Sequence, residues 1–202
     1  MSRYCFYIDG FNVYYALQKT PAYHKYKWLN YRKLAESVIR SKDSITGIFY
    51  FTTLVRWKPG AVKRHEIYIK ALRSAGVETI QGRFLKKEIR CHKCQRYFKT
   101  HEEKQTDVNI ALKIVSDAVE DLYDRALIIS ADSDLLPVIK TVHKLTPEKE
   151  IGVMLPIERS SVELRTNADF RYKMPEKLLK GCQFPDDLKI GKVTLKRPEF
   201  WK

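Results

Sequence analysis

Apolar runs and amphipathic segments alternate along the chain. Apolar or β-rich runs predict strands at 3–9, 46–54, 77–84, 126–130 and 150–155. The segments between them predict helices at 10–19, 31–40, 61–75 and 160–166, with two more that open at Asp107 and follow residues 131–134. Strands that alternate with helices form a mostly parallel sheet covered on both faces, so we predict an α/β fold.

The helix that opens at Asp107 has the clearest periodicity. Its apolar residues follow helical spacing, and acidic residues occupy the other face. The apolar positions are Val108, Ala111, Leu112, Val115, Ala118, Val119 and Leu122.

Two segments lack such periodicity. Residues 85–104 are basic and polar, and we expect an insertion or a hairpin there. The end of the chain is basic and predicts an irregular tail. We therefore predict one domain over residues 1–175, which contains the 85–104 insertion, and a basic C-terminal extension over 176–202.

The composition adds a strong positive charge to this picture. The chain has 202 residues, 38 Lys and Arg against 24 Asp and Glu, and a net charge of +14. Its hydrophobic content of 44% is sufficient for a substantial core, which excludes a disordered basic tail. No segment approaches the roughly 18 apolar residues of a membrane span, and no signal peptide is recognisable. Four cysteines without an export signal favour a reducing compartment, so we expect a cytoplasmic protein with a polyanionic partner, most simply nucleic acid.

The positive charge is not evenly distributed. Residues 102–134 hold nine acidic and three basic residues, whereas the remainder carries an excess of 20 positive charges. We predict an acidic cation-binding pocket surrounded by a surface that attracts phosphates. The densest basic group is our candidate nucleic-acid-binding set: Arg83, Lys86, Lys87, Arg90, Lys93, Arg96, Lys99 and Lys104.

Carboxylates follow two of the predicted strands. Asp9 ends the first strand, and Asp132 and Asp134 come just after the 126–130 strand. Reactive groups of such folds gather beyond the carboxyl ends of the strands, where Asp107 and Asn12 are also within plausible reach. Close carboxylates repel one another by roughly 1–4 kcal/mol per pair at ~4 Å, and a hard cation such as Mg²⁺ or Mn²⁺ offsets that repulsion. Taken singly, Asp107 and Asp132 could instead be helix caps, but independent caps need not fall at the ends of neighbouring strands.

At these residues the sequence resembles a known family. DGFNVYYAL (9–17), EEKQTDVNIAL (102–112) and SADSDLLPVI (130–139) are similar to the three signature segments of NYN domains of the LabA-like branch. That family belongs to the PIN-like metal-dependent nucleases, so the resemblance implies a three-layer α/β/α sandwich.

The resemblance also implies roles for individual residues. Asp9, Asn12, Asp107, Asp132 and Asp134 occupy the positions implied to bind metal and cleave RNA. Asp9, Asp107 and Asp132 are the first candidates for metal ligands, Asp134 is a further ligand or holds a water, and Asn12 orients the phosphate or a water. Ser130 and Ser133 match neighbouring polar positions, and Asp169 matches a further position of less defined role. The implied activity is Mg²⁺- or Mn²⁺-dependent hydrolysis of RNA.

The cysteine pair suggests a second metal. Cys91 and Cys94 have the spacing of a zinc knuckle, and His101 follows. Zinc requires four ligands, so His92, Cys182 or a second copy of the chain would have to complete a structural site. A turn with free thiols at the tip of a basic hairpin is the alternative.

An aromatic loop and two other functions remain open on the sequence alone. Tyr23, Tyr26, Trp28 and Tyr31 alternate with lysines and either stack on unpaired bases or pack as a flap on the domain.

A non-catalytic RNA-binding or regulatory module is the main alternative to a nuclease. A toprim-like domain ranks low because the first strand ends in Asp9 rather than glutamate, and a haloacid-dehalogenase-type phosphatase fails because position 11 is Phe.

Overall fold

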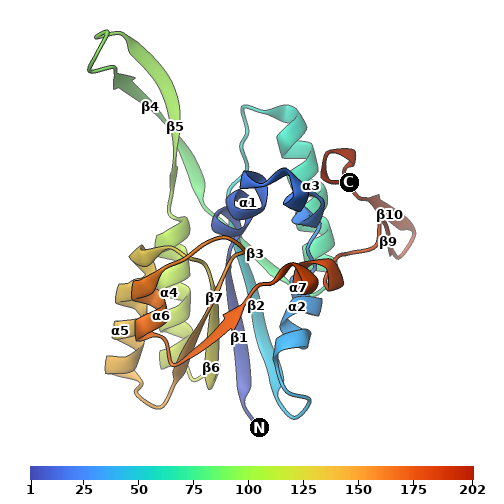
Figure 1. Ribbon diagram of the computed structural model, residues 1–202, viewed down its shortest axis with the longest axis vertical. Coiled ribbons are helices and arrows are strands. Elements are labelled where there is room, and N and C mark those ends of the chain that lie inside the picture. The colour runs from blue at the N-terminus through green and yellow to red at the C-terminus, as the bar shows by residue number, and fades with distance from the viewer.

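A six-stranded parallel sheet forms the centre of the computed structural model, which describes residues 1–202 (Figure 1). Its strands lie in the order β3-β2-β1-β6-β7-β8, and every neighbouring pair is parallel. They are β1 (Arg3–Asp9), β2 (Ser44–Thr52), β3 (Glu78–Gln81), β6 (Arg125–Ile129), β7 (Glu150–Leu155) and β8 (Phe170–Lys173). The chain builds outward from β1 in one direction and from β6 in the other, so the strand order reverses between these two strands.

Helices cover both faces of the sheet. Side chains alternate along β1, so that Phe6 and Ile8 enter one core while Cys5 and Tyr7 enter the other. The first core includes residues of α1 (Gly10–Lys19), α2 (Tyr31–Val38) and α3 (Pro59–Ser74). The second includes residues of α4 (Thr106–Val119), α5 (Leu136–Leu145) and α6 (Val162–Asn167). The predicted three-layer α/β/α architecture is confirmed.

The basic segment forms an antiparallel hairpin. Its strands are β4 (Arg83–Arg90) and β5 (Tyr97–Lys104), joined by a turn that contains Cys91 and Cys94. Figure 1 shows the hairpin extending well away from the sheet. The strand predicted at 77–84 is divided, because β3 ends at Gln81 and Arg83 already belongs to β4.

The end of the chain is folded, so the prediction of an irregular tail is wrong. It contains α7 (Glu176–Gly181), the antiparallel pair β9 (Asp187–Ile190) and β10 (Val193–Lys196), and a short 3-10 helix (Glu199–Trp201). Trp201 is buried and packs against Trp28 and Tyr68. Apolar burial outweighs the positive charge of this segment, whose charged side chains are exposed except for that of Arg197, which is paired with Asp186.

The aromatic loop also packs on the domain, as the flap alternative proposed. It forms a 3-10 helix (Pro21–Lys27), and Tyr26, Trp28 and Tyr31 are buried in the first core. Trp28 Nε1 donates a hydrogen bond to the Pro185 carbonyl oxygen, which ties the loop to the end of the chain. None of the helices is long and apolar enough to cross a membrane.

Helix α4 buries part of the stripe that its periodicity suggested, since Ala118 is buried and Ala111 and Val115 pack against the second core. Ile110 and Ile114 are fully buried, whereas Leu112 and Val119 are exposed. Asp117 lies on the buried side, where its carboxylate accepts hydrogen bonds from Tyr7 Oη and Lys113 Nζ at 2.7 Å each. These two donors make burial of an aspartate possible.

We predict that Asp117→Ala lowers the free energy of unfolding by about 2–4 kcal/mol, because the Tyr7 hydroxyl is then buried without a partner and Lys113 loses its carboxylate. Urea unfolding measures the change. Glu120→Ala is the control, since Glu120 is exposed and accepts a hydrogen bond only from Ser116, and we expect a change below about 0.5 kcal/mol.

Candidate functional site

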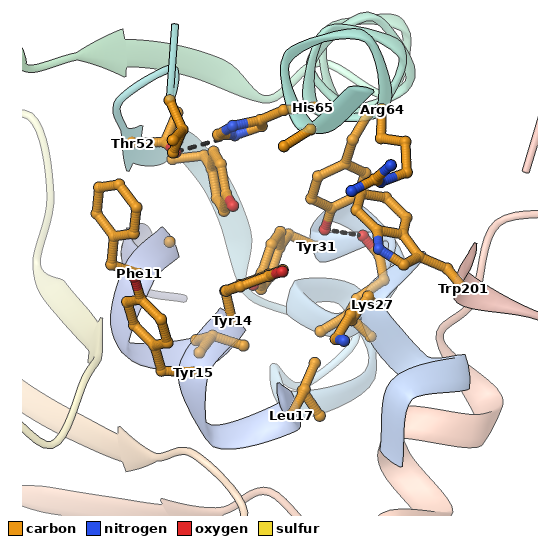
Figure 2. Close-up of a pocket in the computed structure, with 17 residues that line it drawn as sticks. Phe11, Tyr14, Tyr15, Leu17, Lys27, Tyr31, Thr52, Arg64, His65 and Trp201 are labelled. Carbon is orange, nitrogen blue, oxygen red and sulfur yellow. Dashed lines mark hydrogen bonds between the residues drawn. The ribbon is translucent and has the colours of Figure 1, made fainter. Parts of the chain in front are cut away.

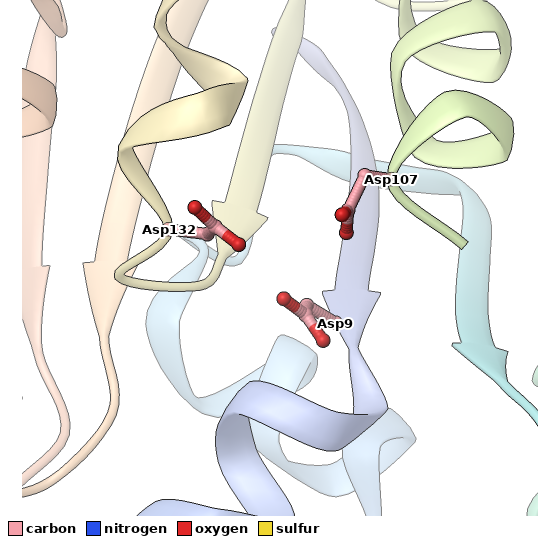
Figure 3. Close-up of side chains that lie close together, drawn as sticks. All are labelled: Asp9, Asp107 and Asp132. Carbon is pink, nitrogen blue, oxygen red and sulfur yellow. The ribbon is translucent and has the colours of Figure 1, made fainter. Parts of the chain in front are cut away.

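Three carboxylates meet where the strand order reverses. Asp9, Asp107 and Asp132 each offer an oxygen atom, and these atoms lie within 4.8 Å of one another (Figure 3). Asp9 is the last residue of β1, Asp132 follows the end of β6, and Asp107 lies in the first turn of α4. The fold therefore brings together three of the acidic residues that the sequence singled out.

The end of β1 holds Asp9 in place. Its carboxylate caps α1 by accepting a hydrogen bond from the backbone N–H of Asn12 at 2.9 Å. The helix starts directly at Gly10, where a Cβ atom would lie 2.6 Å from the Phe51 carbonyl oxygen and from the Tyr50 ring. Only glycine permits this close approach, which lets the chain turn from strand to helix immediately after the carboxylate.

The loop after β6 is hydrogen-bonded to the end of β1. Ser130 Oγ donates to Asp9 Oδ2 at 2.9 Å and accepts from the backbone N–H of Asp132 at 3.1 Å. Asn12 Oδ1 accepts from the backbone N–H of Ala131 at 3.1 Å. Ser130 and Asn12 thus fix Asp9 and Asp132 relative to each other, and the amide oxygen of Asn12 already has this backbone partner.

Asp134 lies beside the cluster rather than within it. Its backbone N–H donates to Asp132 Oδ1 at 3.0 Å, and its side chain is exposed. Asp134 is not among the residues whose oxygen atoms meet within 4.8 Å. The structure therefore separates Asp134 from the other three predicted ligands.

Asp107 is oriented by the junction between β5 and α4. Gln105, which precedes α4, has a φ of 81°, in the left-handed region. Glu103 accepts a hydrogen bond from the backbone N–H of Thr106 at 3.3 Å and from Thr53 Oγ1 at 3.2 Å. This anchoring makes Glu103 a fourth carboxylate at the pocket wall.

Burial makes the cluster electrostatically unfavourable. Asp9 is only 5% exposed, and this burial raises its pKa to about 6. Hydrogen bonds from Asn12 and Ser130 lower this pKa, and the negative charges of Asp107 and Asp132 raise it further. Burial, followed by the charge of Asp132, also raises the pKa of Asp107. Oxygen-only donors that repel one another fit a hard divalent cation, which would relieve this repulsion.

The carboxylates open into a cavity of about 270 Å³, which we call the acidic pocket. Residues that sequence reasoning did not assign to the site also line it. They are Phe11, Tyr15, Phe84, Glu103, Thr106 and Arg159. Phe11 and Tyr15 lie four positions apart in the helix that follows Asp9, which was a usable signal, whereas Arg159 reaches the pocket only through tertiary folding.

The predicted zinc ligands are not assembled within one chain. His101 lies opposite Lys86 in the hairpin, and its ring stacks on Trp57 with 3.5 Å between ring centroids. The strand register therefore holds His101 several residue pairs away from the turn with Cys91 and Cys94. Cys182 is buried elsewhere, beside Ser37, and no group of three candidate ligands forms around the cysteine pair.

A family model described as the NYN domain matches residues 3–174. The chain belongs to the NYN domain family. The match spans the whole central sheet and the acidic pocket, and this family is generally a family of nucleases.

Two individual proteins are similar to this NYN-domain protein. The 6-hydroxy-3-succinoylpyridine 3-monooxygenase HspA of Pseudomonas putida (strain DSM 28022 / S16) is 28% identical over 239 residues, which cover 96% of this chain and 74% of HspA. The crystal structure of VPA0982 from Vibrio parahaemolyticus RIMD 2210633, a protein of unknown function, matches with a TM-score of 0.59 and 18% identity. That match covers 87% of this chain and 94% of the Vibrio chain, and it shows a shared fold.

We predict that Asp9→Asn stabilises the metal-free protein. The rise of the Asp9 pKa to about 6 means that the ionised group costs up to about 3 kcal/mol of folding free energy above pH 6. This cost declines as the pH falls toward 4, because the folded state then holds the proton. Urea unfolding in EDTA should show a larger gain for Asp9→Asn at pH 8 than at pH 5, and an equal gain at both would contradict the electrostatic explanation.

Proposed function

We propose that the protein is a metal-dependent ribonuclease that hydrolyses RNA phosphodiester bonds. The cluster of Asp9, Asp107 and Asp132 at the strand-order reversal carries the proposal. The NYN family match supports the nuclease class, and the resemblance of the three motifs favours the LabA-like branch. We place this activity in the cytoplasm.

Asp9, Asp107 and Asp132 would hold a divalent cation, for which we propose Mg²⁺ or Mn²⁺. Such a cation activates water and stabilises the negative charge that develops on a phosphodiester. The side chain of Asp134 would hold a water at the cation, while its backbone N–H donates to Asp132.

The protein groups around the carboxylates would orient the reactants. Ser130 and the N–H of Asn12 keep both oxygens of Asp9 fixed by hydrogen bonds. The side-chain NH₂ of Asn12 remains free to donate to a phosphate oxygen, since only its carbonyl oxygen bonds to Ala131. Arg159 is the one basic side chain among the residues that line the acidic pocket, and it would contact the scissile or an adjacent phosphate.

One face of the β4–β5 hairpin offers a path for RNA away from the pocket. Directly paired residues share a face, so Phe84 and Glu103 at the pocket continue outward into Lys86, Lys99 and Arg90. Arg83, Lys87 and Lys104 lie on the opposite face, where Lys87 and Lys104 are paired with Glu102. All eight predicted nucleic-acid-binding residues are exposed. We propose that the Lys86 face holds the RNA backbone.

A non-catalytic RNA-binding module is the alternative, because it would use the same hairpin without turnover. The name of HspA assigns a monooxygenase activity to that protein, and 28% identity does not by itself transfer it. The carboxylates suit a hard cation and lie next to the basic β4–β5 hairpin. This combination favours RNA cleavage over a non-catalytic binding module and over a monooxygenase. A homodimer is compatible with each function.

We predict that Asp132→Asn abolishes cleavage of RNA, by at least ~100-fold, while the folded structure persists. Asp134→Asn should cause a smaller loss, because Asp134 lies outside the cluster. The measurement is cleavage of a mixed RNA and DNA panel in Mn²⁺, Mg²⁺ or EDTA, with circular dichroism as the folding control. Full activity of Asp132→Asn in Mn²⁺ would refute the proposed site, and cleavage of DNA in preference to RNA would change the substrate class.

The hairpin proposal has its own test. Lys86→Gln with Lys99→Gln should weaken RNA binding and reduce the slope of log affinity against log salt by roughly 0.7 for each phosphate that is no longer neutralised. Lys87→Gln is the matched control, because Lys87 lies on the other face and is already paired with Glu102. If Lys87→Gln weakened RNA binding as much as the Lys86 and Lys99 substitutions do, both faces would attract RNA equally, and the proposed path along the Lys86 face would be wrong.

A further inference from the structure

A second cavity adjoins the acidic pocket. It has a volume of about 100 Å³, the same order as the roughly 150 Å³ of an apolar cavity that admits benzene. Aromatic side chains dominate its wall, among them Phe11, Tyr14, Tyr15, Tyr31 and Trp201 (Figure 2). We call it the aromatic cavity.

The two cavities share part of their walls. Phe11 and Tyr15 line both, and their rings stack with centroids 6.1 Å apart. Both belong to α1, the helix that Asp9 caps. A group in the aromatic cavity would therefore be a direct neighbour of a group bound at the carboxylates.

Two cations line the aromatic cavity without an acidic partner. Lys27 is only 4% exposed, and its ammonium group donates to Gln18 Oε1, a neutral acceptor. Arg64 lies over the ring of Phe200, and neither cation forms an ion pair. Figure 2 shows both on the side of the cavity away from Phe11 and Tyr15.

This arrangement is unfavourable in the absence of a ligand. Burial and the charge of Arg64 lower the pKa of Lys27 to about 8. A buried cation without a carboxylate is costly, and an anionic group of a ligand would remove the cost. Aromatic walls add stacking surface for a planar ring. Ring and anion together define the ligand class as a planar aromatic group that carries a negative charge.

We propose that the aromatic cavity binds the base of one nucleotide of the RNA, next to the bond held in the acidic pocket, and that Lys27 and Arg64 attract the phosphate attached to it. The choice of a nucleotide over another aromatic anion rests on the proposed ribonuclease function. Of the two lysines in the 3-10 helix Pro21–Lys27, the buried Lys27 would thus contact the ligand, whereas the exposed Lys25 would not.

The test measures binding in EDTA, so that the carboxylates hold no cation. Quenching of tryptophan fluorescence, to which Trp201 in the cavity wall contributes, reports occupancy by a panel of nucleoside 5′-monophosphates. We expect at least one of them to bind at least tenfold more tightly than its nucleoside and than ribose 5-phosphate. Equally tight binding of ribose 5-phosphate would reduce the cavity to a phosphate site, and tighter binding of benzoate would indicate a small aromatic acid; either result overturns the proposal.

Variants locate the site. Arg64→Gln and Lys27→Met should each weaken nucleotide binding at least tenfold, whereas the exposed neighbours Lys63→Gln and Lys25→Met should leave it unchanged. Arg64 is only partly buried, so Arg64→Gln remains informative if Lys27→Met does not fold. Unchanged affinity in Arg64→Gln would refute the assignment. Asp132→Asn should retain nucleotide binding, so that a failure of the nuclease proposal and a failure of this one give different results.

Discussion

The buried carboxylate of Asp9 is the constraint around which the site is arranged. The protein contains two strongly buried aspartates and treats them differently. Asp117 is neutralised within the chain by Lys113 and Tyr7, whereas Asp9 receives only neutral donors and faces two further carboxylates. A cation supplied from solution would take the place at Asp9 that Lys113 takes at Asp117. Stability is therefore lost at the point where a bound ion would restore it.

Uncompensated positive charge lies in the neighbouring aromatic cavity. Lys27 and Arg64 line the aromatic cavity, among whose lining residues there is no acid. Unpaired charges of both signs thus lie on the two sides of Phe11 and Tyr15. A phosphodiester bound with a cation would supply both complementary charges: the cation for the carboxylates and the phosphate for Lys27 and Arg64.

The sequence predicted the layers and the three carboxylates because strand ends and helix starts are local signals, and parallel strands place their ends on one edge. The hydrophobic pattern was misleading where the burial of a polar side chain depends on the residues that contact it in the fold. The stripe with Leu112 and Val119 looked apolar, yet α4 buries Asp117 instead, because Lys113 and Tyr7 compensate its charge. Trp201 and Arg159 reach their positions only through contacts between distant segments, for which composition carries no signal. His101 lies away from Cys91 and Cys94 within the chain because the hairpin register, not its spacing from Cys94, sets its position.

The strand order also has a consequence for synthesis of the chain. Asp9 is synthesised before Ser130, which fixes it and lies 121 positions later. The central pairing of β1 with β6 spans the same interval, so the carboxylate edge is a contact of high sequence separation. A growing chain therefore carries its basic hairpin before it can assemble the acidic pocket.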